Sequence, residues 1–285
     1  MIDREWIVRK TLFVFAMVAV LGILLIVVLI TQQAAPSIAK AGPFQMLFSS
    51  NWNPDAGHFG MLIFIVGTFA TTLGGLMIGV PLAIGTALFL TQMASKRVAA
   101  PVSRVIEILA GIPSIVIGWL GLTMLVPAIR NIFGTNQGSG LLAASLVLGI
   151  MIVPTITAIA KDALEAVPAA YRQASIGLGA TRWQTIRHVI LPAAKNGLIV
   201  AVILGMGRAI GETVAVAMVI GPATAFPKSL TSPTHTLTTK IVTDIGEASG
   251  MQRSGLFAMA LLLLLIAMAL ILAVRWVARD REFAR

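Results

Sequence analysis

Residues 205–216 read GMGRAIGETVAV, and they lie inside an apolar segment that covers residues 193–220. A helix of this length can cross the hydrocarbon core of a bilayer, which is about 30 Å thick. Arg208 and Glu212 are four residues apart, so a continuous helix would place both charges on one face. An arginine at membrane depth costs about 3 kcal/mol on insertion scales. A membrane protein tolerates this free-energy cost where the charge has a partner or lines a solvated path. We therefore take Arg208 and Glu212 as the candidate functional site.

The composition of the 285-residue chain is typical of a membrane protein. Hydrophobic residues make up 58% of the sequence and charged residues 11%, and the mean hydropathy is +0.94. The formal net charge is +10, but the basic residues flank apolar segments instead of alternating with aromatic residues, so we expect no nucleic-acid partner. The lack of cysteine excludes disulfides and thiolate metal ligands. The histidines lie far apart, and the sequence therefore predicts no metal site.

Six apolar segments predict an all-α, polytopic membrane protein with six transmembrane helices. The first segment has about 20 residues, which is longer than the core of a secretory signal peptide, and we interpret it as a retained helix. We expect residues 1–58 to form this helix and an external loop, and residues 59–285 to form the main transmembrane domain. Gly111 and Pro113 interrupt the third span near its middle. The predicted spans are residues 12–31, 59–95, 101–126, 139–160, 193–220 and 255–277.

The distribution of basic residues predicts how the helices are oriented. Fifteen lysines and arginines lie at the two termini and in the loops on the same side of the membrane, and five lie in the opposite loops. By the positive-inside rule, both termini and the loop of residues 161–192 face the cytoplasm. The loop of residues 221–254, which contains His235 and Lys240, then faces outward. It either contacts an external partner protein or is simply solvated.

The cytoplasmic loop of residues 161–192 is expected to form two short helices joined by a turn. Residues 162–174 carry apolar side chains at helical spacing, and Gly179 permits a tight turn after them. A second amphipathic helix is expected to run from Thr181 to the residue before Pro192, where the proline ends it. Spacing alone leaves open whether this hairpin docks on a protein or lies on lipid headgroups.

The same loop carries a sequence motif at fixed spacing. The residues Gln-Ala-Ser at 173–175 are followed after three positions by Gly179, and after nine more by Val-Ile-Leu-Pro at 189–192. This pattern resembles the EAA-x3-G-x9-I-x-L-P loop of ABC importer permeases, which docks into a groove of a cytoplasmic ATPase. Glutamine stands here where the family has its glutamate. The resemblance implies ATPase-coupling contacts for Gln173, Ala174, Gly179, Arg182, Leu191 and Pro192.

Further strings extend the resemblance over most of the chain. They are LAGIPS at residues 109–114, GLGATRW at 177–183 and GRAIGET at 207–213. In this order they are similar to the PstC-type permeases of phosphate ABC importers, which have the type I ABC importer permease fold. The sister PstA type shares the Arg-Ala-Ile-Gly-Glu core and remains an alternative. The resemblance implies a heterodimer with a PstA-type permease in a bacterial inner membrane, with two ATP-binding subunits and an external phosphate-binding protein as further partners.

If the chain transports phosphate, as the resemblance implies, Arg208 and Glu212 can bind it. The guanidinium of Arg208 offers a planar fork of donors that matches phosphate oxygens. Glu212 would hold Arg208 between transport cycles and accept a hydrogen bond from a protonated phosphate oxygen, which sulfate does not offer at neutral pH. The alternative is a plain ion pair that locks two helices together. Thr68 and Ser114 supply hydroxyls that either line the substrate path or mediate helix packing.

The sequence has no G-x4-G-K-[ST] loop, so ATP and Mg²⁺ are expected on the partner ATPase subunits. We therefore expect a pore subunit surrounded by membrane lipid that is not itself an enzyme and needs no cofactor. A permease for sulfate or molybdate is the alternative among transporters. A secondary carrier or a channel is the alternative from another class, and it would predict an inverted repeat or a chain of membrane carboxylates. A non-transporting scaffold would have no use for a charged pair at mid-depth.

Overall fold

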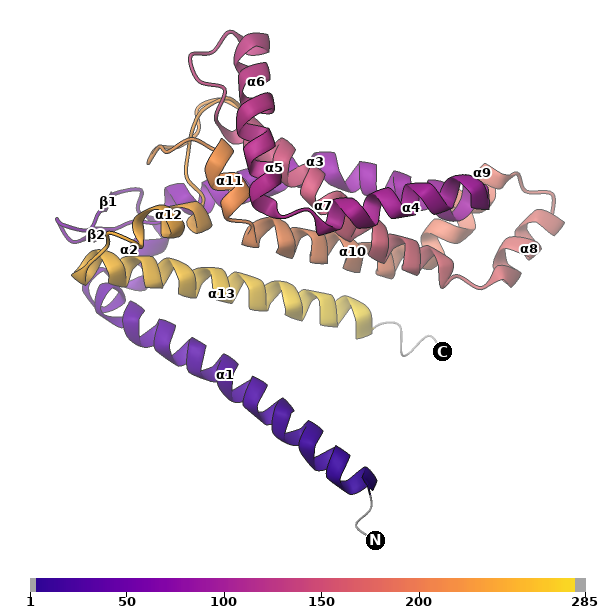
Figure 1. Ribbon diagram of the computed structural model, residues 1–285, viewed down its shortest axis with the longest axis horizontal. Helices are drawn as coiled ribbons and strands as arrows, with labels where there is room; N and C mark the ends of the chain where they lie inside the picture. The colour runs from indigo at the N-terminus through magenta and orange to yellow at the C-terminus, as the bar shows by residue number, and fades with distance from the viewer. Residues whose placement is uncertain (1–3, 280–285) are drawn as a thin grey trace. The chain divides into compact units, whose positions relative to one another are not determined.

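Most of the described chain folds into helices, and several of these are long and apolar enough to cross a membrane. The computed structural model describes residues 4–279 (Figure 1). Within this range the membrane-length helices are Val8–Ala41, Leu62–Met93, Ser114–Phe133, Leu141–Glu165, Arg182–Gly211 and Gly250–Val277. The prediction of an all-α polytopic membrane protein is therefore confirmed.

Several of the membrane-length helices are built from shorter elements, among which η denotes a π-helical turn. In chain order the elements are α1 (Arg4–Ala41), α2 (Pro43–Phe48), β1 (Trp52–Asn53), β2 (His58–Phe59), α3 (Leu62–Leu88), η1 (Phe89–Met93), α4 (Lys96–Gly111), α5 (Ser114–Leu120), η2 (Gly121–Leu125), α6 (Val126–Phe133), α7 (Leu141–Glu165), α8 (Ala169–Gly177), α9 (Arg182–Thr185), η3 (Ile186–Ile190), α10 (Leu191–Gly211), α11 (Val214–Val219), α12 (Leu237–Asp244) and α13 (Gly250–Arg279). The two strands pair antiparallel.

The chain forms two compact units, and the first contains residues 4–62 and 244–264. Small residues bring its helices together. The N–H of Ser37 in α1 donates to Ser254 Oγ in α13 at 3.0 Å, and Ser254 Oγ donates to the carbonyl of Gln33 at 2.7 Å. The next residue, Gly255, packs on the ring of Phe59, where a Cβ atom would come within 2.8 Å. Because Ser254 and Gly255 are small, the start of α13 can approach α1 and Phe59 closely; larger side chains at these positions would hold the segments apart.

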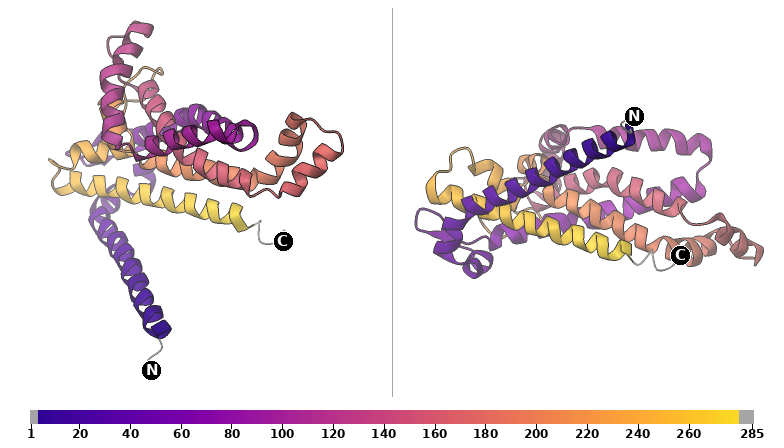
Figure 2. Two further views of the ribbon diagram at one scale, coloured as in Figure 1. Left: turned by 45° about the vertical axis from the view of Figure 1, so that its right-hand side comes forward. Right: turned by 90° about the horizontal axis from the view of Figure 1, so that it is seen from below.

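The second unit contains residues 63–243 and 265–279, and α7 lies in its core. Ile152 and Ile156 of α7 are fully buried. Gly79 of α3 lies against Ile152, and Gly205 of α10 lies against Ile156. Glycine allows such close approach of helix backbones, which is how helices associate where no hydrophobic effect drives them together. As a result α7 and α10 pack side by side (Figures 1 and 2).

Two prolines follow π turns instead of ending helices. Pro192 comes two residues after η3, and Pro127 comes two residues after η2. At the end of η3 the N–H of Leu191 donates to the carbonyl of Ile186, five residues earlier. This wider turn accommodates the missing N–H and the ring of the proline, so the helix continues to Gly211. The prediction that the second cytoplasmic helix ends before Pro192 is therefore wrong.

The third membrane-length helix begins later than expected. Ile112 is extended, with φ −67° and ψ 127°, because Pro113 disfavours the helical conformation at the residue before it. The chain therefore leaves α4 at Gly111 and starts a new helix at Ser114. The predicted span of residues 101–126 is corrected to Ser114–Phe133. The preceding α4 is a separate amphipathic helix.

Candidate functional site

The GMGRAIGETVAV stretch contains a break between two helices. α10 ends at Gly211, and Glu212 is extended, with φ −68° and ψ 131°. The carboxylate of Glu212 turns to the start of α11, where Oε1 accepts hydrogen bonds from the N–H groups of Thr213 at 3.2 Å and Ala215 at 3.3 Å. The expectation that one continuous helix carries Arg208 and Glu212 on the same face is therefore wrong.

Arg208 lies in the last turn of α10, and its side chain is exposed in the single chain. Lys161 and Glu165 form an ion pair at 3.9 Å within residues 4–279. Arg208 and Glu212 do not form one, and this part of the chain provides no hydrogen bond to the Arg208 guanidinium. The expected ion pair between Glu212 and Arg208 is therefore absent from the described part of this chain, and the role of each side chain in transport stays a prediction. The donor fork of Arg208 is left available.

A second helix break lies beside the first. Gly118 of α5 packs against Ala215 and Met218 of α11, and Gly121, which follows α5, packs against Val219. The contacts advance in the same direction along both segments, so α5 and α11 run parallel (Figure 1). The first residues of the two segments, Ser114 in α5 and Val214 in α11, therefore lie at the same end of this pair. Ser114 is half-buried there. Ser114 therefore lies at the end of α5 that corresponds to the end of α11 following the break at Glu212.

Thr68 is in a different position. Its side chain is 2% exposed, and its hydroxyl donates to the carbonyl of Phe64 at 2.7 Å and accepts from the N–H of Leu237 at 2.9 Å. The residue after Leu237 is Thr238, and its Oγ1 donates a hydrogen bond to the carbonyl of Glu212 at 3.0 Å. Thr68 therefore fixes the start of α12, and α12 in turn holds the backbone at the Glu212 break.

The segment that makes these contacts was missed by sequence reasoning. Residues 234–239 read THTLTT, and the expectation for their loop was a solvated or partner-binding surface. His235 is only 6% exposed, and Thr239 is fully buried. Thr236 and Thr239 exchange hydrogen bonds between backbone N–H and side-chain oxygen, at 2.8 and 3.1 Å, and so cap α12. The repeated threonines were the available signal, because hydroxyl groups can satisfy one another inside a membrane protein.

The hairpin of residues 161–192 has the helix–turn–helix shape that its motif implies. Gly179 takes a positive φ of 84° in the turn. Thr181 and Gln184 form a reciprocal capping box at the start of α9, and the hydroxyls of Ser175 and Thr185 lie 2.9 Å apart and join α8 to the following helix. Leu191 is half-buried, and the remaining motif residues are exposed, namely Gln173, Ala174, Gly179, Arg182 and Pro192.

The exposed surface of this hairpin is partly apolar. Leu178 is 89% exposed, and Tyr171, Ile176 and Trp183 are each about half exposed. Side chains of this kind are common at surfaces that another protein covers. No group of three or more His, Cys, Asp or Glu side chains that could hold a metal ion occurs within residues 4–279.

Known proteins match the chain over most of its length. The family described as "Binding-protein-dependent transport system inner membrane component" matches residues 75–282. The "Probable ABC transporter permease protein YqgH" of Bacillus subtilis (strain 168) is 44% identical over 84% of this chain and 79% of that protein. The "Phosphate transport system permease protein PstC" of Pasteurella multocida (strain Pm70) is 37% identical over 92% of this chain and 88% of that protein.

Solved structures give the same result for the fold. The inward-facing MetNI methionine ABC transporter aligns with a TM-score of 0.54 and 27% identity, over 76% of this chain and 94% of that one. A bacterial alginate ABC transporter aligns with a TM-score of 0.66 over 98% of this chain and 96% of that one, at 15% identity, and supports the fold alone. These matches confirm the resemblance to PstC-type permeases, and the chain belongs to the family of inner-membrane components of binding-protein-dependent transport systems.

Proposed function

We propose that this chain is the permease subunit of an ATP-driven importer of inorganic phosphate and forms half of its pore. The observation that carries the proposal is the similarity of nearly the whole chain to proteins named phosphate transport system permease protein PstC. The exposed guanidinium of Arg208, next to two aligned helix breaks, supports the assignment, because it supplies an oxyanion-binding group at the end of a membrane-length helix.

The other half of the pore is a homologous PstA-type permease. Two ATP-binding subunits supply ATP and Mg²⁺, and an external binding protein delivers phosphate. The chain lies in a bacterial inner membrane with both termini in the cytoplasm. Residues 1–58 add one transmembrane helix to a permease domain of residues 59–285, and the loop of residues 161–192 docks on an ATPase. The exposed apolar side chains of that loop support this contact.

In the pore, Arg208 binds two phosphate oxygens through its planar fork. Glu212 does not pair with Arg208 in this proposal, and its two carboxylate oxygens have separate roles. Its Oε1 holds the start of α11, and its Oε2 accepts a hydrogen bond from a protonated phosphate oxygen. Ser114 offers a hydroxyl at the corresponding end of α5. Thr68 is a positioning residue, because it reaches the break only through α12.

Transport by reconstituted complexes tests this proposal. The full assembly is placed in vesicles with phosphate-loaded binding protein, and uptake of labelled phosphate is measured. Arg208→Gln removes charge-assisted hydrogen bonds, so we expect uptake to fall about tenfold or more. Arg208→Lys keeps the charge without the fork and should give an intermediate rate. Arg130→Gln changes another exposed arginine, in α6, and should leave uptake unchanged.

Two results would contradict the proposal. If the Arg208→Gln complex assembles normally and takes up phosphate at the wild-type rate, Arg208 is not in the substrate path. If the wild-type assembly hydrolyses ATP in response to sulfate-loaded or molybdate-loaded binding protein and not in response to phosphate, the transporter is a permease for another oxyanion.

A further inference from the structure

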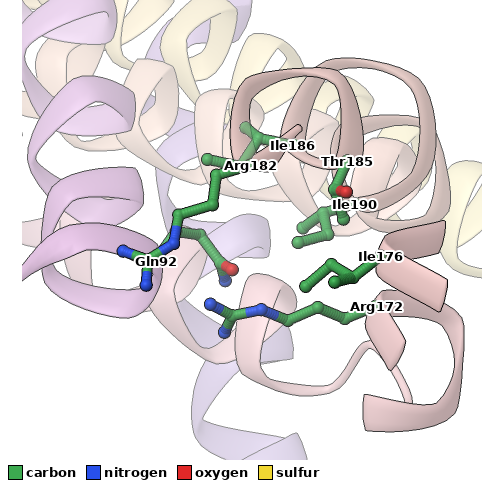
Figure 3. Close-up of a pocket in the computed structure, with 7 residues that line it drawn as sticks. All are labelled: Gln92, Arg172, Ile176, Arg182, Thr185, Ile186 and Ile190. Atoms are coloured by element: carbon green, nitrogen blue, oxygen red, sulfur yellow. The ribbon is translucent and has the colours of Figure 1, made fainter. Parts of the chain in front are cut away.

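Two arginines from the hairpin of residues 161–192 converge on one small pocket. Arg172 comes from α8 and Arg182 from the start of α9, and Gln92 of η1 lines the same pocket (Figure 3). Thr185 and three isoleucines complete the lining, namely Ile176, Ile186 and Ile190. The pocket has a volume of about 10 Å³, which is room for about one water molecule. Arg172 is half-buried and Arg182 is exposed in the single chain.

The charges at this pocket are not balanced by the protein. Within residues 4–279, neither Arg172 nor Arg182 has a carboxylate within ion-pair distance. Two guanidinium groups that face the same space repel each other. A bound anion would remove the repulsion.

The segments that carry the two arginines are held in place independently of any anion. The hydroxyls of Ser175 and Thr185, 2.9 Å apart, join the helix of Arg172 to the helix of Arg182. The capping box of Thr181 and Gln184 fixes the first turn that carries Arg182. A site whose ligands are already positioned binds at a lower entropic cost than one that must be assembled.

We propose that the mouth of this pocket binds a phosphate-type oxyanion from the cytoplasmic side. The oxyanion lies between the guanidinium groups of Arg172 and Arg182, and the side-chain amide of Gln92 donates a third hydrogen bond. It stays at the mouth, because the interior holds only about one water. The anion would then connect η1, at the end of α3–η1, to the cytoplasmic hairpin.

This connection would make the pocket a product sensor. Phosphate that accumulates in the cytoplasm would restrain the hairpin that couples the chain to its ATPase, and import would slow. The sensing role rests on the proposed function as a phosphate importer. The binding site itself requires only an oxyanion, which is either free inorganic phosphate or the phosphate of a lipid headgroup.

Binding of labelled inorganic phosphate to the assembled transporter tests the site. The complex carries Arg208→Gln, so that the pore does not contribute, and it is placed in nanodiscs of phosphatidylcholine without ATP or binding protein. We expect Arg172→Gln to weaken phosphate binding about tenfold. Gln92→Leu serves as a second variant from outside the hairpin and should also weaken binding. Arg187→Gln, an exposed arginine of the same hairpin that does not line the pocket, should leave binding unchanged.

The lipid composition distinguishes the two sources. If phosphatidylglycerol in the nanodiscs displaces labelled phosphate from the complex with intact Arg172, the lipid headgroup is the ligand of the same site. If phosphate binds equally to complexes with and without Arg172→Gln, the proposal is wrong. It is also wrong if no phosphate binds and Arg172→Gln releases the ATPase subunits, because the arginines then hold an acidic surface of the ATPase. None of these outcomes depends on phosphate uptake, which tests the proposed function separately.

Discussion

The carboxylate of Glu212 has two competing partners, the guanidinium of Arg208 one turn earlier and the backbone N–H groups of α11. An ion pair four residues apart on a helix contributes about 0.3–0.5 kcal/mol. A side chain that caps the start of a helix contributes about 0.5–2 kcal/mol, and Glu212 accepts two such hydrogen bonds. The cap is therefore the stronger interaction, and it ends α10. With the carboxylate held by α11, Arg208 has no ion pair within residues 4–279.

Replacing Glu212 with glutamine tests its part in selecting phosphate over sulfate. A glutamine can still accept the hydrogen bonds that cap α11, so the break should persist. Its NH2 group would face the substrate as a donor where the carboxylate was an acceptor. We therefore expect Glu212→Gln to lose about tenfold in discrimination against sulfate, measured as competition by sulfate for phosphate binding to the complex without binding protein. Glu247→Gln, an exposed residue outside the site, is the control. Unchanged discrimination in Glu212→Gln would exclude the hydrogen bond to protonated phosphate.

Gly118 determines how closely the two aligned helix segments approach. A Cβ atom at this position would lie 2.7 Å from the Cα atom of Ala215, so Gly118→Ala should push α5 from α11. Overpacking of this kind costs about 1–3 kcal/mol, and we expect the Tm of the detergent-solubilised chain to fall by several degrees. Gly85 in α3 has no atom within 4 Å of its added Cβ. Gly85→Ala should therefore be neutral or slightly stabilising, and equal Tm values for the two variants would contradict the packing argument.

At the scale of helices and turns, the sequence predicted the membrane-length helices, which depend on the hydropathy of contiguous residues. It missed helix breaks that depend on tertiary contacts. Six apolar segments were enough to predict six helices, because hydropathy accumulates along the chain. The break at Pro113 was predicted to lie within a span, but it separates two helices. The break at Glu212 was not predicted, since glutamate is a good helix former. It depends on the cap of α11 and on the hydrogen bond from Thr238, which comes from 26 residues away.

The candidate site was predicted in part for the same reason. Arg208 was proposed as a site residue because of its cost in an apolar segment, and Ser114 because it supplies a hydroxyl within a span. Thr68 was identified as a polar residue within a span, but its hydrogen bonds to Phe64 and Leu237 could not be derived from spacing. The burial of the THTLTT segment was hidden by its polarity, because a run of threonines has no apolar periodicity to indicate a core.

The π turn before Pro192 sets the rotation of the hairpin of residues 161–192 relative to α10. It holds one residue more than an α-helical turn would need, so its loss would rotate residues 182–190 by about 100°. Pro192→Ala restores the missing N–H and removes the reason for the turn. We expect this variant to assemble but to hydrolyse several times more ATP per phosphate transported. Pro101→Ala alters a proline of α4 that follows no π turn, and it should keep the wild-type ratio. A wild-type ratio in Pro192→Ala would show that the π turn has no part in coupling.

At the scale of the whole molecule, the second unit leaves a charged side chain and large apolar side chains without a protein partner in the described part of this chain. It exposes the guanidinium of Arg208 on a membrane-length helix. Large apolar side chains of α4 and α5 are exposed as well, among them Val105, Ile108 and Trp119. Lipid can cover the apolar side chains but not the charge, which is costly in hydrocarbon. A second permease that closes a solvated pore around Arg208 would satisfy both requirements.

The path of the chain through the membrane is testable because the sequence contains no cysteine, so single introduced cysteines report accessibility without background. Ser95 and Asn136 are both exposed, and the segment between them holds α4 and the membrane-length helix Ser114–Phe133. If α4 lies outside the hydrocarbon and the positive-inside rule holds, this segment crosses once. A membrane-impermeant maleimide should then label Asn136→Cys in cells whose inner membrane is intact, and Ser95→Cys only after lysis. Labelling of both cysteines from the same side would mean that α4 crosses the membrane as well, which its basic residues Lys96, Arg97 and Arg104 make unfavourable.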